Sequence, residues 1–301
     1  SEMQQWLDSL TALLPQAHLC EFASLTSRQK RQCQLAIVAN PDPQELAQLP
    51  NLVWVHSVWA GVERMLTELA DRSFAIVRLV DPCLAQTMAE AVLAWTLYLH
   101  RDMPVYKTQQ NQARWQQRPY VAAAERTVGI LGLGELGAVS GQRLQANGFK
   151  VMGWSRQLKV IEGVCAVSGA AGLAELLSHS DIVINLLPLT SQTRGLLDGV
   201  RFRQCKQGAA LINFGRGATV VEGDLLIALD QGWLSHAVLD VFEQEPLPSE
   251  HPFWLQPNLT LLPHISAPTS VVSASAIVAN NIQGYLATGE IPRAVDRQQG
   301  Y

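Results

Sequence analysis

The chain has 301 residues, a length typical of about two domains. Hydrophobic residues make up 48% and charged residues 16%, a composition that supports a large core and excludes widespread disorder. The net charge of −4 gives no general attraction to nucleic acid or to an anionic membrane, so neither is expected as a partner. Any site for an anion must therefore be built locally.

The cysteines are odd in number and show no C-x-x-C spacing; they are Cys20, Cys33, Cys83, Cys165 and Cys205. This pattern favours reduced thiols over a disulfide framework or a zinc site, and we expect no metal. The first residues, "SEMQQWLDSL", lack the basic and apolar pattern of a signal peptide. No apolar run approaches the about 18 residues of a membrane span. We therefore expect a cytoplasmic protein.

The first part of the chain alternates short apolar, β-rich runs with helical patterns. We predict strands at 35–40, 51–58 and 74–80, which indicates a parallel sheet covered by helices. The stretch 85–106 is predicted to form a long helix ended by Pro104. The polar and aromatic segment 109–120 is predicted to be a loop or an arm rather than core.

A second strand-and-helix block begins abruptly at 126–137. Further strands are predicted at 150–155, 181–188, 209–215, 236–242 and 259–266. The helical pattern at 271–289 has no strand of its own left to cover, so we expect it to return to the first block. The sequence thus predicts an α/β protein of two doubly wound parallel-sheet domains: a discontinuous one, 1–98 with 269–301, and a second one, 99–268.

Three glycines mark a candidate phosphate-binding loop. Gly132, Gly134 and Gly137 form G-x-G-x-x-G directly after a strand and before a helix. The first permits a tight turn, the second lets the backbone approach a pyrophosphate, and the third allows close helix–strand packing at a helix N-terminus that favours anions. Glycines also serve ordinary turns, but this setting predicts a Rossmann dinucleotide site, with Glu135 pointing to solvent.

The choice of nucleotide depends on the end of the next strand. Ser155 stands eighteen positions after Gly137, where NAD sites prefer an acid for the ribose hydroxyl, and Arg156 and Lys159 follow. A hydroxyl with two cations suits the 2′-phosphate of NADPH. The alternative is a solvated loop with incidental basic residues. We predict NADPH as cofactor.

Three polar residues follow predicted strand ends, where an open α/β sheet binds its ligands. They are Arg216, Glu245 and His264. Taken singly, such residues are most often a surface charge or a structural histidine. Together they suit hydride transfer to a carbonyl: the arginine clamps a carboxylate, the histidine donates a proton, and the glutamate orients the ring and raises its pKa.

The chain resembles the D-isomer-specific 2-hydroxyacid dehydrogenases in a series of ordered motifs. These are "GILGLGELG", "NLLPLT", "NFGRG", "LDVFEQEPLP" and "PHISAPT", with "WVHSVWAGVERML" in the first block and "AVDRQQGY" at the end. Within the family it is most similar to the NADPH-dependent glyoxylate/hydroxypyruvate reductases. The resemblance implies a Rossmann cofactor domain, a flavodoxin-like substrate domain and a cleft between them.

The resemblance also implies residue roles. Arg216 would bind the substrate carboxylate and keto oxygen, with His264 as acid/base and Glu245 as its partner. Asp240 would hold the nicotinamide carboxamide, and backbone amides of Ala60 and Gly61 would grip the carboxylate, although "VWAGV" is also an ordinary strand-to-helix turn. Trp59 would either cap the pocket or belong to the core. The implied cofactor contacts are Gly132, Gly134, Glu135, Leu136, Gly137, Trp154, Ser155, Arg156, Lys159, Leu187, Pro188, Thr193, Phe214, Gly215, Asp240 and Ser266.

Two positions depart from the family pattern: Glu135 in the glycine loop, and Ser266 where alanine is common. The expected reaction is NADPH-dependent reduction of a small 2-keto acid, glyoxylate to glycolate or hydroxypyruvate to D-glycerate, in a homodimer with 100–120 as a candidate arm. Alternatives are another dehydrogenase of the family, of D-lactate or phosphoglycerate type, and a non-enzymatic dinucleotide sensor or corepressor. An imine or β-hydroxyacid reductase would share only the glycine loop and the arginine.

Overall fold

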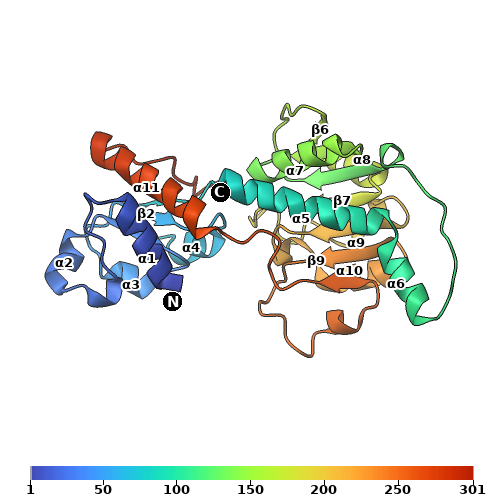
Figure 1. Ribbon diagram of the computed structural model, residues 1–301, viewed down its shortest axis with the longest axis horizontal. Coiled ribbons are helices and arrows are strands. Elements are labelled where there is room, and N and C mark those ends of the chain that lie inside the picture. The colour runs from blue at the N-terminus through green and yellow to red at the C-terminus, as the bar shows by residue number, and fades with distance from the viewer. Residues whose placement is uncertain (1, 301) are drawn as a thin grey trace. The chain divides into compact units, whose positions relative to one another are not determined.

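The computed structural model describes residues 2–300, which form two compact units, Ser1–Leu84 with Thr269–Tyr301 and Ala85–Pro268 (Figure 1). The boundary falls at 84/85, whereas the sequence placed it at 98/99. The difference arises because helix α5 (Pro82–His100) buries Met88 and Val92 in the same core as Val128 and Ile130 of the second unit. The domain to which a long apolar helix such as α5 belongs depends on the sheet that it covers, and the sequence does not show which sheet that is.

Within residues 2–300, the first unit contains a parallel sheet of three strands in the order β1-β2-β3. Its strands are β1 (Leu35–Val38), β2 (Trp54–Ser57) and β3 (Ala75–Val77). Its helices are α1 (Glu2–Leu13), α2 (Ser27–Gln32), α3 (Pro43–Ala47), α4 (Glu63–Glu68) and α11 (Val271–Thr288). Helix α11 lies beside α1, where Gln283 donates a hydrogen bond to the carbonyl of Leu13 at 2.9 Å (Figure 1).

The second unit contains a parallel sheet whose strands, in the described part of the chain, follow the order β10-β9-β8-β7-β4-β5-β6. The strands are β4 (Thr127–Leu131), β5 (Lys150–Ser155), β6 (Val164–Ser168), β7 (Ile182–Asn185), β8 (Ala209–Asn213), β9 (Leu234–Leu239) and β10 (Leu259–Leu261). Strand order reverses between β4 and β7, so the carboxyl ends of these two strands flank the crevice where such sheets bind ligands. The predicted α/β class with parallel sheets is confirmed.

Helices cover both faces of the second sheet. Helices α5 and α7 (Glu135–Ala146) close one core, and α8 (Gly169–His179), α9 (Gly199–Gln204) and α10 (Glu222–Asp230) close the other. Short 3-10 turns complete the two units at Phe22–Ser24, Ala123–Glu125, Gly217–Thr219 and Pro252–Leu255. Two apolar faces on one sheet account for its nearly continuous buried strands, such as Ala209–Asn213.

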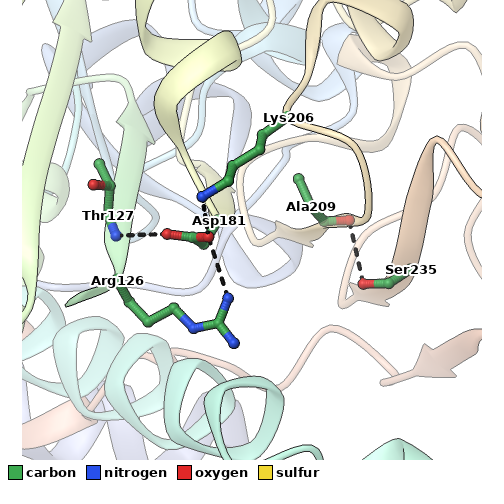
Figure 2. Close-up of polar contacts among 6 residues, drawn as sticks. All are labelled: Arg126, Thr127, Asp181, Lys206, Ala209 and Ser235. Atoms are coloured by element: carbon green, nitrogen blue, oxygen red, sulfur yellow. Dashed lines mark hydrogen bonds and ion pairs between the residues drawn. The ribbon is translucent and has the colours of Figure 1, made fainter. Parts of the chain in front are cut away.

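The amino ends of the strands are held by a buried carboxylate. Asp181 accepts hydrogen bonds from Lys206 Nζ at 2.7 Å, from the Thr127 amide at 2.8 Å and from Arg126 Nη1 at 3.2 Å (Figure 2). Burial alone would raise the pKa of Asp181, but these donors outweigh it and lower the pKa. The edge of the sheet away from the ligand crevice is therefore fixed by charge. Beside it, Ser235 donates a longer bond to Ala209 (Figure 2).

The expected single helix over 85–106 is wrong in one respect. The chain breaks after α5 and resumes as α6 (Met103–Asn111), with Asp102 in the left-handed region at φ 56°. Pro104 lies in the first turn of α6 and begins a helix rather than ending one, because the first turn has no acceptor for the amide that proline lacks. The segment after Asn111 is irregular, as expected.

No helix among residues 2–300 is long and apolar enough to cross a membrane. All five cysteines are free thiols, and no group of three potential metal ligands occurs within the same residues.

Candidate active site

The glycine loop joins β4 to α7 and its three glycines have different surroundings. Gly132 has a φ of 100°, which side-chain-bearing residues rarely adopt, and a Cβ there would lie 2.9 Å from the Leu186 carbonyl. A Cβ on Gly137 would collide with the carbonyl of Gly132. A Cβ on Gly134 would meet no described heavy atom within 4 Å. Gly134 is thus not required by the packing of the loop.

Open space at Gly134 lies at the N-terminus of a helix of twelve residues, where amide groups and the helix dipole favour an anion. Gly134 is the N-cap of α7 and offers no side-chain cap for these amides. Glu135 is exposed, in agreement with its expected orientation toward solvent, and Leu136 is half-buried. The loop therefore fits the pyrophosphate of a dinucleotide.

The loop after β5 carries the residues expected to select the nucleotide. Ser155 is buried, and its hydroxyl donates to the carbonyl of Gln157 at 2.6 Å, which closes a tight turn. Lys159 is exposed, yet its Nζ donates to the carbonyl of Leu133 in the glycine loop at 2.7 Å. Arg156, between them, is exposed. The β5 loop and the glycine loop are therefore joined, and a cation lies beside the glycine-rich turn.

Trp154, the last predicted contact on this strand, donates from its indole nitrogen to the carbonyl of Gly169 at 2.8 Å. That bond ties β5 to the start of α8. Because this bond fixes the Trp154 indole against α8, it stabilises the end of β5 from which the β5 loop starts.

Beyond β7, Leu187 is buried and Pro188 is half-buried. The Thr193 hydroxyl donates to the carbonyl of Pro188 at 2.6 Å and accepts from the Thr190 amide at 2.8 Å. Thr193 is only 9% exposed, so in this structure its hydroxyl shapes the loop after β7. Hydrogen bonds therefore fix the loop after β7, where the adenosine side was expected.

A buried amide network, which the sequence analysis did not name, links the neighbouring strand ends. Asn185 donates from Nδ2 to Asn213 Oδ1 at 2.9 Å and to the Thr219 hydroxyl at 2.6 Å. Asn213 Oδ1 also accepts from the amide of Gly215, beside buried Phe214. The available signal was an asparagine ending each apolar run, "IVIN" and "ALIN". The network sets the path of the backbone that leads to Arg216.

The sheet edge brings Glu245 and His264 into contact. His264 Nδ1 donates to Glu245 Oε2 at 2.8 Å, and the other carboxylate oxygen, Oε1, accepts from the Phe242 amide at 3.0 Å. Arg216 is close enough to influence the pKa of both, and its Nη1 also donates to the Gly215 carbonyl at 2.7 Å. The three residues predicted to act together are thus neighbours in the second unit.

The pair is electrostatically matched. The hydrogen bond that His264 donates to Glu245 raises the pKa of His264, although burial opposes it, and the charges of Glu245 and Asp240 add to the rise. Burial would raise the pKa of Glu245, but the bond from His264 and that from Phe242 outweigh it and lower the pKa. A carboxylate therefore faces an imidazole that keeps its proton to a higher pH than an unpaired histidine does. With Nδ1 on Glu245, Nε2 is the nitrogen left to exchange a proton with a substrate.

His264 stands in the left-handed backbone region at φ 54°, and Asp240 fixes the chain that follows it. Asp240 is 2% exposed, and its two oxygens accept from the amides of Ile265 at 2.7 Å and Ser266 at 2.8 Å. The Ser266 hydroxyl is buried and has no partner among the described residues. Asp240 therefore orders the histidine loop, a use that the sequence did not indicate.

Trp59, Ala60 and Gly61 belong to the first unit, directly after β2. The Trp59 amide donates to the Ser57 hydroxyl at 3.1 Å, and its carbonyl accepts from Leu79 at 3.1 Å, so this loop is tied to the end of β3. Trp59 is 41% exposed, which excludes it from the core and leaves its indole available to a ligand.

A dinucleotide-type sheet that carries a proton-holding imidazole on its ligand edge is the arrangement of a nicotinamide-dependent oxidoreductase. Residues 93–266 match the family model described as D-isomer specific 2-hydroxyacid dehydrogenase, NAD binding domain. The chain belongs to this family.

Relatives and solved structures agree over nearly the whole chain. It is 38% identical to glyoxylate/hydroxypyruvate reductase A of Serratia proteamaculans over 97% of this chain and 94% of that protein. A D-isomer specific 2-hydroxyacid dehydrogenase of Xanthobacter autotrophicus, in complex with NADPH and MES, is 35% identical with a TM-score of 0.93, covering 99% and 96% of the two chains. An NADPH-dependent glyoxylate/hydroxypyruvate reductase of Sinorhizobium meliloti, in complex with NADP and sulfate, is 34% identical with a TM-score of 0.91 and the same coverage.

Proposed function

We propose that the protein reduces small 2-keto acids with NADPH, converting glyoxylate to glycolate and hydroxypyruvate to D-glycerate. The observation that carries this proposal is the His264–Glu245 pair beside Arg216 on the ligand edge of the nucleotide-binding sheet. The names of the reductases of Serratia and Sinorhizobium support these substrates, and the name of the Sinorhizobium enzyme supports NADPH.

In this proposal the protein residues manage charge and protons. Arg216 binds the substrate carboxylate through its planar fork of donors and polarises the keto oxygen. When bound, NADPH supplies the hydride to the carbonyl carbon. His264 donates the proton from Nε2 to the resulting alkoxide, while Glu245 stabilises the imidazolium and fixes the ring. A raised histidine pKa keeps the acid form available near neutral pH.

A role in carboxylate binding is also proposed for residues of the first unit. The backbone amides of Ala60 and Gly61 would bind the carboxylate, and the exposed Trp59 indole would cover the substrate. Amide donors at a turn and a guanidinium suit a carboxylate, because they offer several fixed hydrogen-bond donors to its two oxygens.

The residues expected at the 2′-phosphate are Ser155, Arg156 and Lys159. The loop that bears them is held against the glycine loop by Lys159, which supports a role for its cations in binding the cofactor. Asp240 retains lone pairs for the nicotinamide carboxamide after binding two amides, because a carboxylate accepts about four hydrogen bonds. The buried Ser266 hydroxyl, which lacks a described partner, would lie beside it.

Cofactor choice is tested with Arg156→Ala. We expect the KM for NADPH to rise by about tenfold or more, the loss expected for a charge-assisted contact, while the KM for NADH changes little. Arg203→Ala, which removes an arginine from α9, is the matched control. Equal losses with both cofactors would show that 155–159 is only a basic loop.

The reaction is tested by following nicotinamide absorbance with glyoxylate, hydroxypyruvate, pyruvate and phenylpyruvate, each with NADPH and with NADH. We expect fastest turnover with the first two acids and NADPH. NADPH binding without turnover of any acid would favour a dinucleotide sensor instead. A homodimer with 100–120 as its arm and a cytoplasmic location complete the proposal, and sedimentation of the purified protein tests the dimer.

A further inference from the structure

A polar pocket lies at the opposite end of the second unit from the glycine loop. It has a volume of about 80 Å³, and its polar lining comes from the end of α5, the start of α6 and the segment that leads into β4; it includes His100, Arg101, Asp102, Tyr106, Arg118 and Arg126. Arg126 directly precedes β4, and Gly132 directly follows it. At about 3.3 Å per residue these two positions are separated by roughly 20 Å. The polar pocket, called the basic pocket below, is therefore distinct from the glycine loop.

The lining is strongly cationic in a protein with a net charge of −4. Three arginines face a single lining carboxylate among the described residues, Asp102, which pairs with Arg118 Nε at 2.9 Å. Arg126 reaches Asp181 outside the pocket, but Asp181 also binds Lys206 at 2.7 Å (Figure 2). The carboxylates are therefore outnumbered, and positive charge remains concentrated in the basic pocket.

Two residues that line the basic pocket each have a buried nitrogen without a hydrogen-bond partner among the described residues. Arg126 Nε and His100 Nδ1 are buried and have no hydrogen-bond partner within residues 2–300. Buried polar atoms are nearly always paired by protein, water or a ligand, since leaving one unpaired costs about 1–3 kcal/mol. Burial and the charges of Arg126 and Arg101 lower the pKa of His100, so the ring is neutral near pH 7 and the guanidinium groups carry the charge.

The basic pocket offers donors that suit a compact oxyanion. Arg101 lies over the ring of Tyr120 at 5.7 Å, which leaves the donors at the edge of its guanidinium plane available. The Tyr106 hydroxyl accepts from the Arg118 amide at 3.1 Å, and its own proton is free to be donated. The pocket volume is several times the volume that one water needs, about 10–15 Å³. It is well below the volume of pockets that bind organic ligands, which begins at about 300 Å³.

We propose that the basic pocket binds one small tetrahedral oxyanion, of the inorganic phosphate or sulfate class, at a site separate from the cofactor and substrate. Several guanidinium groups around one ion provide the forked donors that phosphate oxygens accept best. The bound ion balances the charge that Asp102 and Asp181 leave uncompensated, and it joins the end of α5 to the segment before β4.

The test is calorimetric titration of inorganic phosphate into the full chain saturated with NADP⁺, with chloride at matched ionic strength as the reference. Saturation with NADP⁺ keeps phosphate from the cofactor site. We expect Arg101→Gln and Arg118→Gln each to weaken phosphate binding by about tenfold or more. Arg203→Gln is the matched control, because Arg203 also lies over an aromatic ring, Trp233, at 4.5 Å.

Asp102→Asn is a variant in which phosphate binding should become stronger, a result that misfolding cannot produce. Asparagine tolerates the left-handed backbone at this position, and its substitution removes the carboxylate that competes with the ion, so phosphate should bind more tightly than in the unchanged protein. Arg216→Gln should leave phosphate binding intact. The proposal is overturned if phosphate does not bind the NADP⁺-saturated chain, if Arg216→Gln abolishes binding, or if the Arg101 and Arg118 variants bind it unchanged.

Discussion

Replacement of Asp240 by asparagine tests how the histidine loop is held. Asp240 is almost fully buried, and each of its oxygens accepts one backbone amide, from Ile265 and from Ser266. An asparagine offers one oxygen and one NH₂ group, so one amide loses its acceptor and faces a donor. Hydrogen bonds to charged groups contribute about 1.5–3 kcal/mol, and an unpaired buried amide adds to the loss, so we expect a cost of about 2–4 kcal/mol.

The effect should be visible in both stability and catalysis. For a unit of this size, about 2–4 kcal/mol corresponds to a decrease in Tm of roughly 5–15 °C. Since His264 directly precedes the two amides, its left-handed backbone is no longer fixed, and kcat should fall in the fraction that stays folded. Circular dichroism on heating and steady-state kinetics at 25 °C measure the two effects.

A matched control is Asp224→Asn. One of its oxygens accepts the Gly199 amide at 2.7 Å, and an asparagine can keep that single bond by presenting its oxygen, so we expect a change below about 1 kcal/mol. An unchanged Tm in Asp240→Asn, or equal decreases in the two variants, would refute the view that Asp240 orders the histidine loop.

Two further predictions concern the proton and the cofactor. In Glu245→Gln the pKa of His264 should fall, because the carboxylate that raises it is removed. Reduction needs the protonated ring and is lost as pH rises through that pKa, so the descending limb of the pH–rate profile should move to lower pH. An unmoved limb would exclude Glu245 from this role. In Gly134→Ala, whose Cβ would meet no described atom within 4 Å, the free energy of unfolding should stay unchanged while NADPH binds about tenfold more weakly or worse, as fluorescence titration measures. Gly223→Ala, equally unhindered in α10, is its control, and wild-type affinity in Gly134→Ala would show that no ligand approaches this glycine.

The sequence was informative where chemistry depends on local pattern. The glycine loop, the strand ends and the residues Arg216, Glu245 and His264 could be named because each follows an apolar run at an edge where ligands bind. The Glu245–His264 contact joins residues nineteen positions apart, and their spacing alone does not show that Nδ1 is the bonded nitrogen. The α/β class followed from the same alternation of strands and helices.

Features that depend on tertiary packing were not predicted. Strand β6 (Val164–Ser168) was not named from the sequence; it is an edge strand whose residues are only partly buried, so its place depends on pairing with β5. The domain boundary was misplaced because α5 is apolar along much of its length, and its sequence does not indicate which sheet it covers. Asp240 was named as a cofactor ligand, and its further use in binding two amides could not be predicted because it depends on where the chain after β10 returns.

The proposed acid is tested most directly with His264→Ala. Because general acid catalysis contributes about 10²–10⁴-fold, kcat for glyoxylate reduction with NADPH should fall by at least about 100-fold, while the Kd for NADPH, measured by fluorescence titration, stays within about twofold. This result would place the role of His264 in proton transfer. Near-wild-type kcat in His264→Ala would contradict the account, since the pair with Glu245 would then have no part in the reaction.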